Sequence, residues 1–287
     1  MKIAIIANCQ TQAISNYMRI ISGCSEIVNV PAHLLGSEQY CKALTKLKDL
    51  VNDGSAIIFT FNLGERFGEI ATQKIKATAK AKVFTITNLF FAGFHPDITY
   101  LGSMGKRILS PLGDYHSKIV LNSFTSGFSE EETIALFNEK TYKDLGFFEE
   151  YNKSKNELLA RDKFSDIQFG EEFLQLVSSK PSLYTMNHPT PDVLYKFTCR
   201  LCEHAGITYS EFPPDFFNNY LSNAAWWPVY KEIAEYHKVN VSLPMIFKQP
   251  DSRGGNVLSL TQFVVRSYMR YNEVGTETIK EAFITNR

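Results

Sequence analysis

The sequence lacks the long apolar segments that anchor a protein in a membrane or direct its export across one. Its N-terminal apolar run, Ile3–Ala7, has five residues and follows a single lysine. A membrane-spanning helix needs about twenty apolar residues, and the core of a signal peptide needs about seven or more. We therefore expect neither a leader peptide nor a membrane anchor, and we expect the protein to be cytoplasmic.

The sequence also lacks an excess of charge of either sign. Thirty Lys and Arg residues are balanced by thirty Asp and Glu residues, so the formal net charge is zero. Proteins that bind nucleic acid or anionic membranes over a wide surface usually carry an excess of positive charge. We therefore expect no nucleic-acid partner, although a local basic patch remains compatible with this balance.

Patterns typical of disulfide scaffolds, metal sites and nucleotide-binding loops are missing as well. Five cysteines in 287 residues are too few, and odd in number, for a disulfide framework. The Cys199-x-x-Cys202 spacing falls well inside a predicted helix, where packing is the expected role, and no second pair completes a metal site. Neither the Walker A motif nor the dinucleotide-binding G-x-G-x-x-G occurs, which argues against a kinase and a classical dehydrogenase.

What the sequence does contain is a regular alternation of strands and helices over its first ninety residues. Short apolar runs alternate with segments whose apolar residues recur at helical spacing, and the third predicted helix has its apolar residues at Phe67, Ile70, Ala71, Ile75 and Ala79. The predicted strands are residues 3–7, 26–30, 56–61 and 82–87, and a further strand is predicted at 183–186, followed by a helix. Such alternation predicts an α/β fold, in which helices flank a parallel sheet.

A segment rich in charged side chains interrupts this pattern. Ser129 and Glu132 form a predicted capping box, which marks the start of a helix, and charged residues are frequent up to residue 163. We therefore predict a single domain, 1–287, with a helix-rich, charged insertion or lid at about 129–180. Another helix is predicted around Leu258–Tyr271.

The first strand ends at Asn8-Cys9-Gln10, directly before a predicted helix. In open α/β sheets, ligands bind at the carboxyl ends of the strands, and the backbone N–H groups of a helix N-terminus favour a thiolate. Cys9 is thus a candidate nucleophile, and the amides of Asn8 and Gln10 are candidate oxyanion donors. The alternative is that Cys9 merely packs against its neighbours, as most buried cysteines do.

Two further strand ends add candidates at the same edge. If residues 183–186 join the parallel sheet, then Asn187 and His188 lie at the edge that carries Cys9, and His188 can act as its base. Asn62, after the strand at 56–61, is a candidate oxyanion donor. The alternatives are a histidine that caps a helix and an asparagine that belongs to an ordinary turn.

The segment His95-Pro96-Asp97 lies in an aromatic, glycine-rich loop after residue 88. Pro96 favours an extended conformation at His95, so the imidazole and the Asp97 carboxylate project from the same loop. Three roles are open for them: they orient each other, they bind a substrate hydroxyl, or they hold the loop together. His95 is in consequence a second candidate base.

Taken together, these motifs resemble those of the WcbI family of bacterial capsular and surface polysaccharide biosynthesis. The resemblance rests on Ala7-Asn8-Cys9-Gln10, Phe94-His95-Pro96-Asp97 and Asn187-His188-Pro189, in this order, and it covers residues 1–205. Family members usually have glycine where this chain has Ala7.

The resemblance implies an acetyltransferase with an α/β, three-layer fold distantly similar to SGNH-type esterases, with coenzyme A bound in a cleft. Cys9 would stand where those esterases have serine, Asn62 where they have asparagine, and His188 where they have histidine. The implied reaction is acetyl transfer from acetyl-CoA to a sugar hydroxyl of a surface polysaccharide, without a metal. Basic residues should bind the coenzyme A phosphates, and the candidates are Lys106, Arg107 and Arg253.

Two other functions remain open. With water as acceptor, the same residues would give a cysteine-dependent esterase or thioesterase. A non-catalytic protein that binds coenzyme A or glycans within a polysaccharide assembly complex is the other alternative. The resemblance implies a sugar or polysaccharide precursor as partner, other assembly proteins as further partners, and a location that includes the inner face of the membrane. The acceptor sugar and the oligomeric state are not determined by the sequence.

Overall fold

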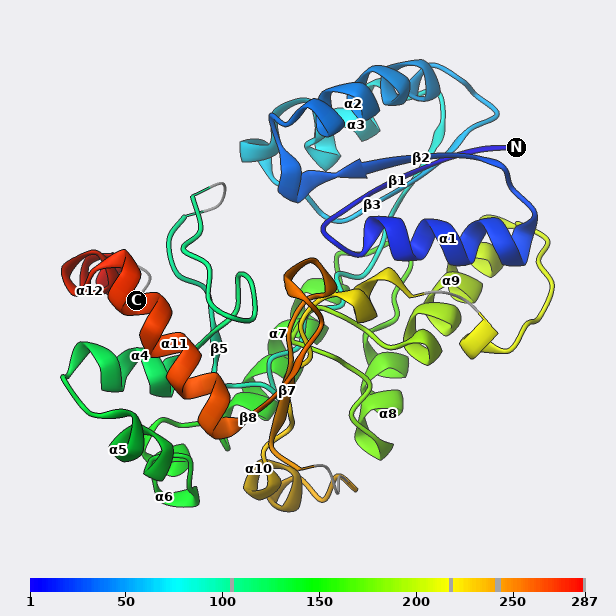
Figure 1. Ribbon diagram of the computed structural model, residues 1–287. Helices are drawn as coiled ribbons and strands as arrows, with labels where there is room; N and C mark the ends of the chain where they lie inside the picture. The colour runs from blue at the N-terminus through cyan, green and yellow to red at the C-terminus, as the bar shows by residue number, and fades with distance from the viewer. Residues whose placement is uncertain (104–105, 217–218, 241–243, 286–287) are drawn as a thin grey trace. The chain divides into compact units, whose positions relative to one another are not determined.

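The computed structural model describes residues 1–103, 106–216, 219–240 and 244–285 (Figure 1). The chain groups into two compact units, which we describe separately. The first unit contains Met1–Phe90, Asn156–Leu176 and His188–Leu221. The second unit contains Phe91–Lys155, Val177–Asn187 and the chain from Ser222 onward.

The first unit is built on a four-stranded parallel sheet with the strand order β2-β1-β3-β4. Its strands are β1 (Lys2–Ala7), β2 (Glu26–Pro31), β3 (Ile57–Thr60) and β4 (Lys82–Thr85). The two central strands are buried on both faces, which explains why they read as continuous apolar runs rather than as alternating ones.

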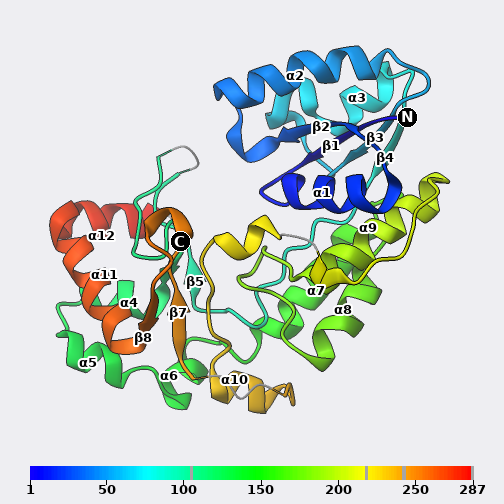
Figure 2. The same cartoon turned by 45° about the vertical axis from the view of Figure 1, so that its right-hand side comes forward.

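Helices cover both faces of this sheet, as the sequence predicts for an α/β fold. α2 and α3 lie on one face, and α1 and α9 lie on the other (Figures 1 and 2). Their bounds are α1 (Thr11–Ser22), α2 (Glu38–Val51), α3 (Thr72–Thr78) and α9 (Pro191–Ala205). α1 packs against α9, where Cys202 Sγ lies 3.4 Å from Met18 Sδ. Cys202 is therefore a packing residue of the helix layer.

The third helix of the predicted alternation is shorter than its apolar spacing indicates. Residues Glu65–Ile70 form the 3-10 helix η2, and α3 begins only at Thr72. Gly68 has φ of 58° inside η2, and Ala71 is extended, so a continuous α-helix from Phe67 onward is wrong. Two hydrogen bonds of the Thr72 side chain hold the start of α3 in place. The Thr72 hydroxyl accepts from the Leu63 N–H and donates to the Phe61 carbonyl.

The predicted strand at residues 183–186 is also wrong. These residues belong to the second unit and form no strand of the sheet. Their backbone groups bond to two separate segments: the Tyr184 carbonyl accepts from Trp227 N–H at 2.8 Å, and the Met186 carbonyl accepts from Phe91 N–H at 2.7 Å. The apolar run is therefore buried by loops rather than by neighbouring strands.

The second unit is mainly helical, with two short two-stranded antiparallel sheets. Their strands are β5 and β6 (Ile98–Thr99 and His116–Ser117) and β7 and β8 (Ile246–Lys248 and Val257–Ser259). The helices are α4 (Lys118–Thr125), α5 (Glu130–Ala135), α6 (Glu139–Asp144), α10 (Lys231–Tyr236), α11 (Leu260–Val274) and α12 (Thr276–Thr285). The capping box at Ser129 and Glu132 is present at the start of α5, as predicted. Aromatic rings fill the core, with Phe247 and Phe263 stacked at 4.3 Å between centroids.

The charged segment contains several helices joined by turns and loops, and its residues divide between the two units. The division falls within α7 (Glu150–Asp162) and α8 (Gly170–Ser179). Residues up to 155 belong to the second unit and residues 156–176 to the first. Compact units of this kind can lie within one domain, so a single domain over 1–287 with an insertion or lid stays a prediction.

Candidate active site

Polar residues follow all four strands of the sheet at the same edge. Because the strands are parallel, their carboxyl ends meet there. Asn8-Cys9-Gln10 follows β1, His33 follows β2 in the 3-10 helix η1 (Ala32–Leu34), Asn62 follows β3, and Asn88 follows β4. The first unit thus gathers a thiol, an imidazole and several amides along one edge.

The turn after β1 is closed by hydrogen bonds to Asn8. The Asn8 carbonyl accepts from the Thr11 hydroxyl at 2.6 Å and from the Thr11 N–H at 3.2 Å. The Asn8 Oδ1 atom accepts from the Gln10 N–H at 3.0 Å. Ala7 is the last residue of β1 and is fully buried. Among the described non-glycine residues, only Lys238 has a positive φ, so the backbone at Ala7 does not require glycine.

Cys9 is half-buried, and its thiol is not the thiolate that its position predicts. Burial raises the pKa of Cys9 to about 12, and a hydrogen bond from its own backbone N–H lowers that pKa only in part. The expectation of a thiolate at rest is therefore wrong. Cys9 needs a base to remove its proton before it can act as a nucleophile.

Gln10 is fully buried and connects two strand ends. Its side-chain Nε2 donates to the Leu89 carbonyl at 3.0 Å, in the segment that follows β4. The Gln10 side chain thus holds the two turns together. Asn62, which follows β3, is exposed, so its amide can reach a ligand at this edge.

His188 belongs to the first unit although the strand expected before it is missing. The ring is buried, and burial together with the charge of His33 lowers the pKa of His188 to about 4. The electrostatic interaction places His188 near the residue that follows β2. His188 is therefore neutral at physiological pH, which is the form that can accept a proton.

His33 and Asn88 are residues that the sequence analysis did not select. Asn88 comes directly after the predicted strand Lys82–Thr87, and His33 comes three residues after the end of the predicted strand Glu26–Val30. A polar side chain at the end of a buried strand was the signal available for each. His33 is exposed and Asn88 is half-buried.

His95 and Asp97 lie in the second unit, where both are buried. The Trp227 carbonyl accepts from His95 Nε2 at 3.1 Å, and burial lowers the pKa of His95 to about 4. The Asp97 carboxylate accepts from Tyr230 Oη at 2.6 Å and from Ile119 N–H at 3.0 Å, and burial raises its pKa. These contacts are the ones expected of residues that hold the loop together.

Asn187 is likewise buried in the second unit. Its Oδ1 accepts from Tyr115 Oη at 2.8 Å and from Thr185 Oγ1 at 3.2 Å. Asn187 and His188 are neighbours in sequence, yet the division between the units falls between them. The hydrogen bonds of Asn187 to Tyr115 and Thr185 thus lie in the interior of the second unit.

The candidate phosphate-binding residues also belong to the second unit. Lys106 and Arg253 are exposed. The Arg107 guanidinium donates to the Gly102 carbonyl and lies 4.4 Å from the ring centroid of Tyr100. These contacts hold Arg107 in one orientation, and Lys106 and Arg253 are available to solvent.

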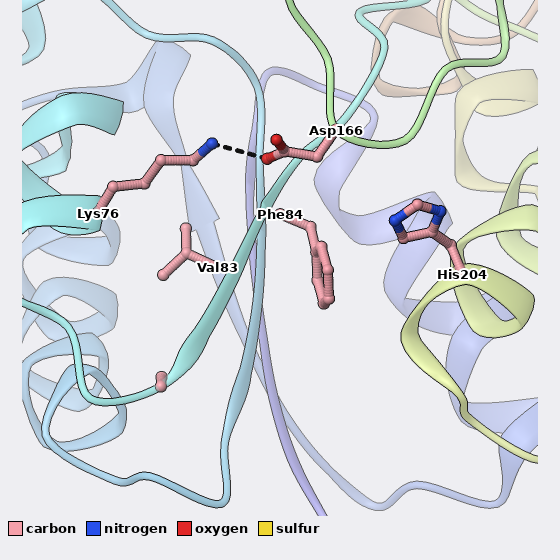
Figure 3. Close-up of a pocket in the computed structure, with 6 residues that line it drawn as sticks. Lys76, Val83, Phe84, Asp166 and His204 are labelled. Carbon is pink, nitrogen blue, oxygen red and sulfur yellow. Dashed lines mark hydrogen bonds and ion pairs between the residues drawn. The ribbon is translucent and has the colours of Figure 1, made fainter.

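Two surface hollows of the first unit lie along the outer edges of the sheet. One has a volume of about 530 Å³ and lies beside β4, where Lys76 contacts Asp166 at 2.7 Å and the His204 ring faces Phe84 (Figure 3). The other, of about 680 Å³, follows β2 and α2. Cys9 lines neither hollow, so the strand-end residues and not these hollows define the candidate site.

Within the described ranges, no group of three or more His, Cys, Asp or Glu side chains is arranged to hold a metal ion. None of the helices described combines the length and apolar character that crossing a membrane requires.

Comparison with known proteins identifies the fold and the family of this chain. Curated proteins give no match to the sequence. A solved structure of WcbI, described as a novel polysaccharide biosynthesis enzyme, matches with a TM-score of 0.72 and 14% sequence identity, over 98% of this chain and 93% of that one. That structure is described as the native protein without a disulfide bond between coenzyme A and one of its cysteines. At this level of identity the likeness shows a common α/β fold.

The sequence itself matches a family model described as "Polysaccharide biosynthesis enzyme WcbI" over residues 2–210. The match includes the whole first unit up to residue 210 and the motifs at Asn8, His95 and His188. The chain therefore belongs to the WcbI family of polysaccharide biosynthesis enzymes.

Proposed function

We propose that the protein is an acyltransferase that moves an acetyl group from acetyl-CoA to a hydroxyl group of a sugar or polysaccharide precursor. The observation that carries this proposal is the turn Asn8-Cys9-Gln10, which places the half-buried Cys9 at the carboxyl edge of the sheet in a family of polysaccharide biosynthesis enzymes. The WcbI structure is described in terms of coenzyme A and a cysteine, which favours a coenzyme A ligand here.

The strand-end residues suit a thioester substrate. The thiol and the imidazole are neutral, and the amides are uncharged hydrogen-bond donors. Such groups can contact the thioester carbonyl and donate hydrogen bonds to the oxyanion that forms from it. When bound, acetyl-CoA supplies an activated acyl group. Lys106, Arg107 and Arg253 are the proposed partners of its phosphates.

His188 is the proposed base. Because its pKa is about 4, it is unprotonated at neutral pH and can accept a proton either from the acceptor hydroxyl or from Cys9. In the first route the acceptor oxygen attacks the acyl carbon, the carbon–sulfur bond breaks, and the protonated His188 returns its proton to the leaving sulfur. In the second route His188 takes the Cys9 proton, Cys9 Sγ attacks the acyl carbon, the carbon–sulfur bond to coenzyme A breaks, and His188 returns the proton to the sulfur of coenzyme A. His188 then takes the proton of the acceptor hydroxyl, the acceptor oxygen attacks the acyl carbon, and Cys9 Sγ leaves and regains a proton from His188.

The amides of Asn8 and Asn62 are the proposed oxyanion donors. The Oδ1 atom of Asn8 already accepts the Gln10 N–H, so the amide NH₂ of Asn8 is the group left to donate to a ligand. Gln10 uses its side-chain donor on Leu89, and we therefore assign it to positioning the turn. His95, enclosed in the second unit, is kept as an alternative base.

The test compares acetyl-CoA turnover by the wild type and by the variants Cys9→Ser and His188→Ala. We expect each substitution to lower the transfer rate to a sugar acceptor by about 100-fold or more, as is typical for loss of a general base or nucleophile. Mass spectrometry of the acid-quenched reaction distinguishes the routes, because only the second leaves an acetyl group on Cys9. An exposed cysteine variant, Cys41→Ser, serves as the matched control.

Two results would contradict the proposal. Rapid release of free coenzyme A without any sugar acceptor would indicate a thioesterase. Full turnover by both variants would show that neither residue carries the chemistry.

A further inference from the structure

Asn88 lies between two fixed points of the segment that follows β4. On one side the Thr87 hydroxyl donates to the Asp162 carboxylate, and on the other the Leu89 carbonyl accepts from Gln10 Nε2 at 3.0 Å. The Asn88 carbonyl itself accepts from Phe90 N–H at 2.9 Å and from Arg161 Nε at 3.4 Å. The backbone of Asn88 is thus held firmly beside the turn that carries Cys9.

The side-chain oxygen of Asn88 is a hydrogen-bond acceptor that has no donor among the described residues. This Oδ1 atom is enclosed and has no hydrogen-bond partner in the part of the chain that the structure describes. A buried carbonyl oxygen without a partner costs free energy. The residue as a whole is half-buried, so rotation of the side chain can turn this oxygen toward a ligand without moving the anchored backbone.

An acceptor oxygen at this place calls for a ligand with an N–H or O–H donor. In coenzyme A, the amide N–H nearest to the sulfur is two carbons away from it. If the sulfur lies at Cys9, that N–H lies within reach of the neighbouring strand end, because Gln10, next to Cys9, bonds to Leu89, next to Asn88.

We propose that Asn88 is a ligand-binding residue whose side-chain oxygen accepts a hydrogen bond from the pantetheine amide of coenzyme A. This inference rests on the proposed function, since it requires a coenzyme A thioester at Cys9. It gives the strand end after β4 a role of its own, namely to fix the direction in which the pantetheine arm leaves the thiol.

The test measures, by calorimetry, the Kd values of coenzyme A, pantetheine and adenosine 3′,5′-bisphosphate for the wild type and for Asn88→Ala. We expect Asn88→Ala to weaken coenzyme A and pantetheine by about tenfold, the usual effect of losing one hydrogen bond. Binding of adenosine 3′,5′-bisphosphate, which lacks the arm, should be unchanged. Asn88→Asp keeps an acceptor oxygen and should bind pantetheine more tightly than Asn88→Ala does.

Thermal unfolding separates this role from a structural one. Because the free protein gains nothing from the unpaired oxygen, Asn88→Ala should keep or raise the melting temperature while binding is weakened. The exposed Asn52 provides the control variant Asn52→Ala, which should leave all three Kd values unchanged.

Two results would overturn the inference. One is equal coenzyme A affinity in the wild type and Asn88→Ala, whatever the rate of transfer to the sugar, and the other is equal weakening of all three ligands. If the wild type binds no coenzyme A at millimolar concentration, the proposed function itself fails, and that outcome is distinct from the other two.

Discussion

At the scale of single residues, burial explains why Cys9 is a neutral thiol. The N–H groups at the start of α1 are the donors that would stabilise a thiolate. The carbonyl and side-chain oxygens of Asn8 accept from the N–H groups of Thr11 and Gln10 instead. Burial then dominates, and the pKa of Cys9 rises to about 12. The thiol stays protonated, and therefore weakly nucleophilic, until a base removes its proton.

Alkylation kinetics test this directly. At pH 8 we expect iodoacetamide to label the exposed Cys41 well before Cys9, because the thiolate is the reactive form. The labelling rate of Cys9 should keep rising about tenfold per pH unit to beyond pH 10. Mass spectrometry of the digested protein gives both rates in one sample. Labelling of Cys9 at the rate of Cys41 at pH 8 would contradict the raised pKa.

At the scale of elements, the side chain of Asp166 accepts hydrogen bonds from the outer edge of strand β4. The Asp166 Oδ2 atom accepts from the Thr85 N–H, the Thr85 hydroxyl and Lys76 Nζ, each at 2.7 Å. The next residue, Ile167, donates its N–H to the Thr85 carbonyl at 3.0 Å. The end of β4 that leads to Asn88 is therefore paired on its outer side, which fixes the strand end and protects an exposed edge.

We expect Asp166→Ala to lower the free energy of unfolding by about 1–3 kcal/mol, because the buried Thr85 N–H loses its partner. Lys76→Ala removes only the part-exposed ion pair and should cost less than about 1 kcal/mol. Urea unfolding of both variants gives the comparison. Equal losses would mean that the ion pair, rather than the backbone hydrogen bond, stabilises this edge.

At the scale of the whole molecule, buried histidines make stability depend on pH. Burial lowers the pKa to about 4 for His188 in the first unit and for His95 and His116 in the second. The unfolded chain, with histidine pKa values near 6.5, binds more protons than the folded chain between these limits. Acid therefore favours unfolding in both units.

The free energy of unfolding should be highest above about pH 6.5 and fall as the pH drops toward 4, by on the order of several kcal/mol in total. Urea titrations at a series of pH values measure the slope. His188→Gln should make the decline less steep, whereas the exposed His204→Gln should leave it unchanged. A stability that is flat between pH 7 and pH 4.5 would contradict the lowered pKa values.

The sequence by itself determined the parallel sheet, its flanking helices and the turn at Cys9. The apolar runs at Ile3–Ala7 and 56–61, and the helical spacing between them, are local patterns set by burial on two faces or one. The same patterns failed at two places, one through a single glycine and one through contacts distant in sequence. Gly68 interrupts the third helix, and the run at 183–186 is buried by loops that include Trp227.

Only the tertiary structure decided which polar residues face one another and how strongly they are desolvated. His95 is held by Trp227, 132 positions away, and its burial in the second unit has no counterpart in the local sequence. The sequence places Asn88 at the end of a strand, but that it lies beside Cys9 depends on Gln10, 79 positions away from Leu89, which fixes the segment of Asn88. A sequence records where donors and acceptors occur along the chain, whereas desolvation and pairing depend on the neighbours that folding brings from elsewhere.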